Sequence, residues 1–277
     1  MIESIHHQGP HPGPHILLLG GVHGDECPGY LALDALAERF ARGQLELVAG
    51  QVTIIPRVNA QAVALGQHYI DENLNRLITR HVNPDTHEKK LANALIPFLD
   101  AADVVLDIHG TTAPTAPFVF LDDESAPCRA WAQSLGVSYM LAGWPALYEA
   151  GPDVSTTEYA MRQGKLALTV EAGQMADSAA ASIGLSCARA TLSHFGLVPD
   201  QSLASATPLL RLTHVEYFGG QGFLSRQWSN CDRLSAGDLL AQYDDGRRLV
   251  AEQDGYIIMP RPQSKPGEEW YYLAVEE

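Results

Sequence analysis

The sequence Gly-Gly-Val-His-Gly-Asp-Glu, residues 20–26, directly follows an apolar run from Ile16 to Leu19. A glycine-rich turn between a strand and a helix lets side chains converge on a ligand. His23 and Glu26 stand three residues apart, so an imidazole nitrogen and a carboxylate can meet one cation at about 2.0–2.2 Å. In the structural alternative, His23 hydrogen-bonds the loop and Glu26 caps the following helix. The motif alone leaves both interpretations open.

A second histidine ends another apolar run, in the sequence Asp-Ile-His-Gly-Thr at residues 107–111. Together with His23 and Glu26, His109 completes a two-histidine, one-glutamate set, which leaves the fourth position of zinc open for water. Asp107 is placed to orient an imidazole from behind. The alternative is that Asp107 and His109 form a buried hydrogen-bonded pair without a metal.

A carboxylate ends a third apolar run, in the sequence Val-Glu-Ala-Gly at residues 170–173. Zinc lowers the pKa of its bound water from 15.7 to about 7. Glu171 could take the proton from that water and return it to a leaving amine, as general base and then general acid. Alternatively, Glu171 supports the ligands or faces a helix.

Two adjacent donors, Asn75 and Arg76, close the sequence Tyr-Ile-Asp-Glu-Asn-Leu-Asn-Arg at residues 69–76. A guanidinium fork suits two-point contact with a substrate carboxylate. The alternative is a surface salt bridge, the usual state of an arginine among aspartates and glutamates.

The apolar runs that precede these motifs predict buried strands, at 16–19, 52–55, 104–108, 118–121 and 166–170. Helical patterns lie between them. Strands that alternate with helices predict an α/β fold with a mainly parallel sheet and helices on both faces. Ligands bind such sheets beyond the carboxyl ends of the strands, where the motifs would meet.

Four helices are expected. Pro28 suits the first turn of one whose apolar face carries Leu33, Leu36, Ala37 and Phe40. In a second, Leu91, Ala94, Leu95, Phe98 and Leu99 form a stripe, and Pro97 should kink or shorten the helix. Thr156 or Thr157 caps a third that ends at Gly164, and Asp177 caps a fourth that ends at Gly196.

After about residue 200, short β-like runs separated by Gly and Asp turns replace the helical patterns. These runs cover residues 209–218, 239–243, 248–251, 256–259 and 270–274. The sequence therefore predicts a catalytic domain over residues 1–200 and a small β-rich domain over residues 201–277.

The composition limits the partners. The chain has 277 residues, 46% of them hydrophobic, and a formal net charge of −15. Such an acidic protein would repel phosphate backbones and anionic lipid, so nucleic acid and membrane surfaces are poor candidates. The four cysteines lie far apart and indicate reduced thiols. Without a secretory signal or a long apolar run, we expect a soluble, cytoplasmic protein, and a homo-oligomer is compatible with the sequence.

The motifs resemble those of the succinylglutamate desuccinylase and aspartoacylase family, distant relatives of the zinc carboxypeptidases. The resemblance covers roughly residues 15 to 200, and its carrying segments are 20–26, 73–76, 107–110 and 170–173. It implies one zinc ion per chain on His23, Glu26 and His109, with Glu171 as base. It also implies a carboxypeptidase-like fold with a C-terminal β domain. Asn75 and Arg76 would hold the carboxylate of an N-acyl amino acid whose amide bond is hydrolysed.

The sequence departs from the family pattern at His68, where better-known members have an arginine that polarises the scissile carbonyl. Losing such a donor costs about 10²–10³ in rate. Either a protonated His68 substitutes, or Arg57 or Arg80 reaches in, or the substrate differs. We expect a different substrate with His68 still lining the site. Arg162 lies in about the region of the arginine that aspartoacylases use to read a second carboxylate.

Three functions are therefore compared. The preferred one is a zinc-dependent deacylase acting on a small anionic N-acyl amino acid. A metallocarboxypeptidase on the same scaffold would use the same chemistry on a peptide. A small-molecule-binding relative would have kept the pocket and lost turnover.

Overall fold

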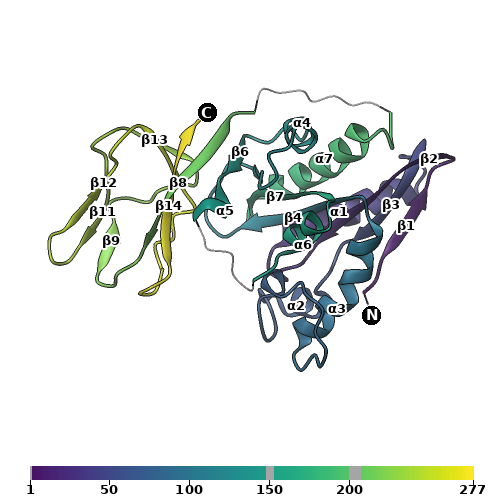
Figure 1. Ribbon diagram of the computed structural model, residues 1–277, viewed down its shortest axis with the longest axis horizontal. Coiled ribbons are helices and arrows are strands. Elements are labelled where there is room, and N and C mark those ends of the chain that lie inside the picture. The colour runs from purple at the N-terminus through teal and green to yellow at the C-terminus, as the bar shows by residue number, and fades with distance from the viewer. Residues whose placement is uncertain (1, 148–152, 200–206) are drawn as a thin grey trace.

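The computed structural model describes residues 2–147, 153–199 and 207–277. An eleven-stranded sheet runs through the molecule in the order β1-β3-β2-β4-β7-β5-β6-β8-β14-β13-β10, and a three-stranded sheet lies at one end (Figure 1). The N-terminal part of the chain contributes seven strands to the eleven-stranded sheet: β1 (Ile5–Gln8), β2 (His11–Gly20), β3 (Ala49–Ile55), β4 (Val104–Thr111), β5 (Phe118–Phe120), β6 (Tyr139–Ala142) and β7 (Leu166–Gln174).

The central strands β3, β2, β4 and β7 are parallel neighbours, whereas β5 is antiparallel to β7. The helices are α1 (Cys27–Ala41), α2 (Ala60–Leu65), a 3-10 turn (Leu74–Arg76), α3 (His87–Ala101), α4 (Ala126–Ser134), α5 (Trp144–Leu147), α6 (Thr156–Arg162) and α7 (Ser178–His194). The predicted α/β class with a mainly parallel sheet is confirmed.

Helices cover both faces of the sheet because its central strands are apolar on both sides. Successive side chains of a strand point to opposite faces. Ile16 and Leu18 pack with residues of α1, α4 and α7, and Leu17 and Leu19 pack with residues of α3 and α6. A continuous apolar run, rather than an alternating one, is what such a doubly covered strand requires.

Three predictions about helices are wrong. Helix α3 continues through Pro97 to Ala101, because Pro97 is exposed near the end of the helix and breaks little of its hydrogen bonding. The buried stripe of α3 is Ala92, Leu95, Ile96 and Leu99, while Ala94 is exposed.

The cap of α6 is Ser155, whose side chain accepts from the backbone N–H of Glu158, and not Thr156 or Thr157. Both threonines lie inside the first turn, where they bond to the sheet. The other three predictions about helix ends are confirmed: Asp177 caps α7, and Gly164 and Gly196 follow their helices with left-handed φ values of 75° and 72°.

The C-terminal strands extend the main sheet. They are β8 (Leu209–Tyr217), β9 (Gly222–Leu224), β10 (Asp232–Leu234), β11 (Leu239–Tyr243), β12 (Arg248–Val250), β13 (Gly255–Ile258) and β14 (Glu269–Glu276). Strand β8 pairs in parallel with β6 and antiparallel with β14, so the β-rich part is joined to the sheet of the α/β part. The predicted boundary at residues 200 and 201 lies outside the described residues.

Strands β9, β11 and β12 form the second sheet, at the end of the molecule away from β1 (Figure 1). It packs on the main sheet around Trp270, Leu240 and Ile257. None of the helices in the described ranges is long and apolar enough to cross a membrane.

Candidate metal centre

The carboxyl ends of three neighbouring strands bring the sequence motifs together. Gly20 at the end of β2 pairs with Ile108 of β4, and His109 of β4 pairs with Glu171 of β7. The loop from β2 to α1 carries His23 and Glu26. The helix that follows can lie against β4 because residue 29 is glycine: a Cβ there would stand 2.1 Å from the carbonyl oxygen of Ile108.

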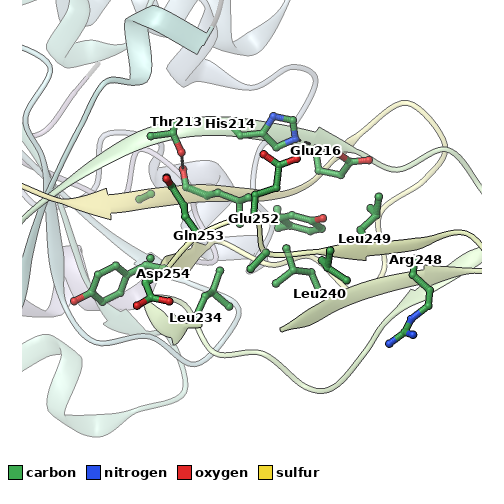
Figure 2. Close-up of a pocket in the computed structure, with 17 residues that line it drawn as sticks. Thr213, His214, Glu216, Leu234, Leu240, Arg248, Leu249, Glu252, Gln253 and Asp254 are labelled. Atoms are coloured by element: carbon green, nitrogen blue, oxygen red, sulfur yellow. Dashed lines mark hydrogen bonds and ion pairs between the residues drawn. The ribbon is translucent and has the colours of Figure 1, made fainter. Parts of the chain in front are cut away.

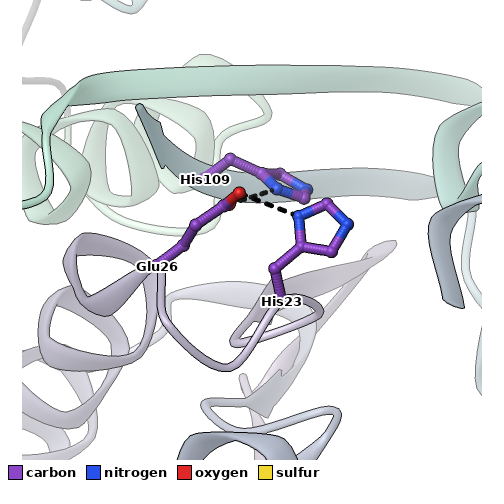
Figure 3. Close-up of side chains that lie close together, drawn as sticks. All are labelled: His23, Glu26 and His109. Carbon is purple, nitrogen blue, oxygen red and sulfur yellow. Dashed lines mark hydrogen bonds and ion pairs between the residues drawn. The ribbon is translucent and has the colours of Figure 1, made fainter. Parts of the chain in front are cut away.

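His23, Glu26 and His109 form a buried cluster in which the glutamate lies between the two imidazoles (Figure 3). The Nδ1 atom of His23 is 2.9 Å from Oε1 of Glu26, and the Nδ1 atom of His109 is 2.7 Å from Oε2. Their ligand atoms all lie within 4.8 Å of one another. These three residues, predicted from separate motifs, are therefore brought to one place.

The outer nitrogens of both imidazoles face oxygen atoms that hold the rings in position. His23 Nε2 is 3.0 Å from Oδ1 of Asn73, and His109 Nε2 is 3.0 Å from Oδ2 of Asp107, the latter at ion-pair distance without hydrogen-bond alignment. Thr156 donates its hydroxyl to the same Asp107 oxygen. Oxygen partners behind metal-binding histidines fix the ring so that the other nitrogen faces the ion. The donor set thus fits a zinc ion with two histidines and one glutamate.

Opposite charges dominate the cluster. Burial raises the pKa of Glu26, but the charge and hydrogen bonds of His109 and His23 outweigh burial and lower that pKa below its ordinary value. Burial lowers the pKa of His109, but the charges of Asp107 and Glu26 outweigh it and raise the pKa well above the ordinary value. Without an ion, His109 therefore favours its protonated form, and a metal bound there must displace that proton.

Glu171 stands beside the cluster with a buried oxygen, Oε2, for which the described residues offer no hydrogen-bond partner. Burial, together with the negative charges of Glu26 and Asp107, raises its pKa to about 8, although the charge of His109 opposes this shift. A buried carboxyl group without a partner is unusual and marks a place where a ligand or water belongs.

His68 lies against the exposed side of the cluster. Its ring stacks on that of His23 with centroids 3.8 Å apart, and its Nδ1 atom is 2.9 Å from Oδ1 of Asp25. Burial and the charge of His23 lower the pKa of His68, against the effect of Asp25. The structure therefore places His68 at the site and not in a remote loop.

Asn75 and Arg76 follow in the 3-10 turn. Asn75 is buried, and its Oδ1 accepts from the backbone N–H of Thr156. Arg76 is half exposed; its Nη1 donates to the carbonyl oxygen of Asn75, and its Nε lies 3.9 Å from a carboxylate oxygen of Asp153. Among the described residues, the ion pair with Asp153 is a loose one, so this guanidinium is held mainly by its bond to the backbone of Asn75.

The structure does not bring Arg57, Arg80 or Arg162 to the cluster. Arg57 forms a two-point ion pair with Asp34, Arg80 pairs with Asp100, and Arg162 pairs with Glu158 one helical turn away. Each arginine has a carboxylate close by on its own part of the surface. We therefore assign none of them to the site.

Sequence reasoning gave no role to two residues that support the site, Asn73 and Glu88. The Glu88 carboxylate is buried and accepts from the backbone N–H groups of Ile70, Asp71 and Glu72. It thereby anchors the loop that carries His68 and Asn73. Asn73 could have been predicted, because it lies in the same motif as Asn75 and Arg76. For Glu88, in the first turn of α3 next to charged residues, the sequence gives no indication of a role.

Comparison with known proteins agrees with this geometry. The model of the succinylglutamate desuccinylase/aspartoacylase catalytic domain matches residues 12–193, well over half of the chain. The chain belongs to this family. The match spans all of the residues of the cluster, together with Glu171.

Curated relatives of the family are deacylases. The chain is 29% identical over 276 residues to an N-alpha-acetyl-L-2,4-diaminobutyric acid deacetylase from Halomonas elongata, covering 90% of this chain and 78% of the relative. It is 27% identical over 272 residues to a succinylglutamate desuccinylase from Burkholderia lata, covering 91% and 76%.

Solved structures share the fold over nearly the whole chain. A succinylglutamate desuccinylase/aspartoacylase from Rhodobacter sphaeroides superposes with a TM-score of 0.81 at 19% identity, covering 96% of this chain and 87% of that one. The product-bound ectoine utilization protein EutE (DoeB) from Ruegeria pomeroyi gives 0.81 at 24% identity, covering 99% and 89%. At these identities the likeness concerns the fold.

A separate hollow lies away from the family motifs, in the C-terminal β region. This open groove of about 590 Å³ lies between the two sheets, with apolar side chains such as Leu240 and Leu249 and carboxylates such as Glu216, Glu252 and Asp254 around it (Figure 2). It contains none of the candidate metal ligands. The chemistry of the cluster, and not the size of the hollow, identifies the candidate active site.

Proposed function

We propose that this protein is a zinc-dependent deacylase that hydrolyses the amide bond of a small N-acyl amino acid or a similar carboxylate-bearing amide. The observation that carries the proposal is the meeting of His23, Glu26 and His109 beside the unpaired carboxyl group of Glu171. That relatives of this family are deacylases supports the same chemistry.

A zinc ion at this centre would activate water and polarise the substrate carbonyl as a Lewis acid. Around it, His23 and His109 turn Nδ1 inward, because Asn73 and Asp107 face their outer nitrogens. Glu26 carries the negative charge that the ion requires. The buried position of these residues excludes bulk water, which strengthens each charge interaction.

Glu171 acts as the general base and then as the acid. A divalent cation nearby favours its ionised form, so the carboxylate can accept a proton from water. It then returns the proton to the leaving amine, which departs as the free amino acid. Its raised pKa in the ion-free protein suits a group that must hold a proton between the two steps.

Arg76 supplies the cationic contact for the substrate carboxylate. Its guanidinium is half exposed and loosely paired, so a substrate can displace Asp153 at little cost. Asn75 is fixed by Thr156 and offers its remaining amide atoms beside Arg76. His68 lines the open side of the site and faces the reacting carbonyl group.

The substrate we favour has one carboxylate. Arg57, Arg80 and Arg162 are all paired elsewhere, which leaves Arg76 as the cation next to the site among the arginines considered. Asp25 and Asp153 add negative charge to the same opening. An acyl amino acid with a neutral or basic side chain, such as an acetylated diamino acid, suits this balance better than succinylglutamate with three carboxylates.

The test is a hydrolysis screen with zinc-loaded protein. Acetylated diamino acids, acetyl and longer-acyl neutral amino acids, succinylglutamate and short peptides are assayed side by side. Release of free amino acid from the acyl compounds, and its loss in Glu171→Gln, is expected. Preferential cleavage of peptides would instead indicate a carboxypeptidase, and thermal stabilisation by acyl amino acids without hydrolysis would indicate a binding protein.

A further inference from the structure

The segment that joins β4 to β5 crosses the end of the strand that carries Glu171. In the main sheet β7 lies between β4 and β5, parallel to the first and antiparallel to the second. The chain leaves β4 two residues after His109 and enters β5 at Phe118, which is the direct partner of Glu171. Residues 112–117, the crossing segment, must therefore pass the carboxyl end of β7 beside the candidate active site.

The end of β7 holds the first part of this segment. The backbone N–H of Met175 donates to the carbonyl oxygen of Thr111 at 2.9 Å, and Nε2 of Gln174 donates to that of Thr112 at 3.0 Å. Residues 112–117 belong to none of the helices and strands given above. Individual contacts therefore decide where the crossing segment lies.

Asn230, from the C-terminal β region, holds the second part of the segment. Its Nδ2 donates to the hydroxyl oxygen of Thr115 at 2.8 Å, and its backbone N–H donates to the carbonyl oxygen of Pro114 at 3.2 Å. Thr115 and Asn230 also form an isolated parallel bridge. Asn230 is only 5% exposed, so water competes little for these bonds. The C-terminal region thus reaches the edge of the active site through a buried side chain.

The C-terminal region also fixes the orientation of the Asn230 amide. Its Oδ1 accepts from the backbone N–H of Met259 at 2.7 Å, which leaves Nδ2 to face Thr115. The backbone has positive φ values at Cys231 and Met259, of 63° and 45°. Such values are costly for residues with a side chain, persist where surrounding contacts demand them, and are frequent at functional sites. The local backbone is therefore shaped around the Asn230 amide.

Thr115 transmits this contact along the crossing segment. Its hydroxyl accepts from Asn230 and donates to the carbonyl oxygen of Ala116 at 2.8 Å. Pro114 and Pro117 restrict φ on either side of it. A short segment restricted in this way has few means of adjusting locally, so release of Thr115 should displace the segment beside Glu171.

We propose that Asn230 is a positioning residue for the deacylase reaction and holds the crossing segment against the substrate beside Glu171. This inference rests on the proposed function, in which Glu171 moves the proton. Arg76, which would bind the substrate carboxylate, lies on a different part of the chain. Displacement of the crossing segment should therefore slow the chemical step more than it weakens binding. The competing interpretation is that the contact only stabilises the junction with the C-terminal region.

The experiment removes each side of the contact in the zinc-loaded, full-length protein. In Asn230→Ala and in Thr115→Val we expect kcat to fall about 10- to 100-fold, because a misplacement of about 1 Å can cost 10²-fold in rate. KM and zinc content should stay near those of the wild type. Thr115→Ser keeps the hydroxyl and should restore the rate. The double variant should be no slower than Asn230→Ala alone, because the effects of two residues that share a contact do not add.

The matched control is Thr213→Val. The Thr213 hydroxyl also donates to a backbone carbonyl oxygen, that of Leu273 at 3.3 Å, but it lies on β8 away from the crossing segment. This variant should keep the wild-type kcat. Amide hydrogen exchange adds a readout that does not depend on turnover. Exchange at residues 111–116 should be faster in Asn230→Ala and Thr115→Val, and unchanged in Thr213→Val.

The outcomes separate this inference from the proposed function. Wild-type kcat in both variants, even with a lower melting temperature, contradicts the positioning role and leaves hydrolysis by Glu171 intact. A loss of rate in Thr115→Val that Thr115→Ser does not restore contradicts it as well. Unchanged exchange at residues 111–116 shows that Asn230 does not hold the segment, whatever the protein hydrolyses. Absence of hydrolysis in the wild type contradicts the proposed function and the positioning role together.

Discussion

His109 and Glu171 are direct partners across the adjacent parallel strands β4 and β7. One is a candidate metal ligand and the other the candidate base, so the register of two strands fixes the distance between ion and base. A register is set by the burial of whole strands and is costly to shift. The catalytic geometry is therefore a property of the sheet and not of a flexible loop.

Replacement of Glu171 by glutamine should abolish most turnover. A positioned general base contributes about 10²–10⁴ in rate, and glutamine keeps the shape of the side chain without accepting a proton. We expect kcat to fall by that factor while zinc content is unchanged, as measured by steady-state kinetics and metal analysis. Glu252→Gln, in the C-terminal groove, is the control. Equal rates in wild type and Glu171→Gln would remove Glu171 from the mechanism.

The stability of the metal-free protein should depend on pH through Glu171. Its pKa rises from 4.5 to about 8 on folding, so the folded state binds more protons than the unfolded state between these values. Stability from this group is fully present below pH 4.5 and is lost as pH rises through 8. Denaturant unfolding of wild type and Glu171→Gln is measured over pH 4–9. The free energy of unfolding of the wild type, relative to that of Glu171→Gln, should fall as pH rises from 4.5 to about 8. A constant difference would contradict the shift.

Loss of the oxygen partners behind the imidazoles should weaken zinc binding. Such partners typically contribute 10–100-fold to metal affinity, because they fix the ring orientation. Asn73→Ala frees His23, and Asp107→Asn alters the support of His109. Competition with a zinc chelator measures the effect. Asn93→Ala, whose side chain bonds the backbone of His81, is the control and should bind zinc as the wild type does.

The sequence was sufficient to predict the fold class and the convergence of three motifs. Apolar runs end directly before Gly20, His109 and Glu171, and parallel strands place such ends at one edge of a sheet. The sequence locates the ends of these strands because each end is a change from apolar to polar residues. That the three motifs meet in space then follows from the parallel arrangement of the strands.

Contacts between distant segments were beyond the sequence. The pairing of Arg57 with Asp34, and the bond from Thr156 to Asp107, depend on the packing of separate helices against the sheet. Likewise, Ser155 rather than Thr156 caps α6 because the threonine hydroxyl is taken by Asp107. The prediction that Pro97 shortens α3 failed because the core packing of Leu95 and Leu99 holds the helix together despite the proline.

Removal of the Arg76 guanidinium should weaken substrate recognition. A hydrogen bond to a charged group is worth about 1.5–3 kcal/mol, which corresponds to roughly 10–100-fold in kcat/KM. Arg76→Ala should show this loss mainly in KM, with zinc content unchanged. Arg162→Ala, which removes an exposed i,i+4 pair with Glu158, should leave both parameters near those of the wild type. An unchanged KM in Arg76→Ala would mean that another group holds the carboxylate.

Glu88→Gln should loosen the loop that carries His68 and Asn73. Burial raises the pKa of Glu88, but its hydrogen bonds from Ile70, Asp71, Asn59 and Glu72 outweigh burial and lower the pKa. An amide has one acceptor oxygen, so the variant cannot keep all of these bonds, and each bond to a charged group contributes about 1.5–3 kcal/mol. We expect a fall of that order in the free energy of unfolding and faster amide exchange at residues 70–72.

Because the lowered pKa of Glu88 stabilises the folded state above pH 4.5, the difference in free energy of unfolding between wild type and Glu88→Gln should shrink as pH falls below that value. Glu46→Gln, a substitution on the loop that precedes β3, serves as the control in both measurements. Unchanged exchange at residues 70–72 would show that the loop is held by its other contacts.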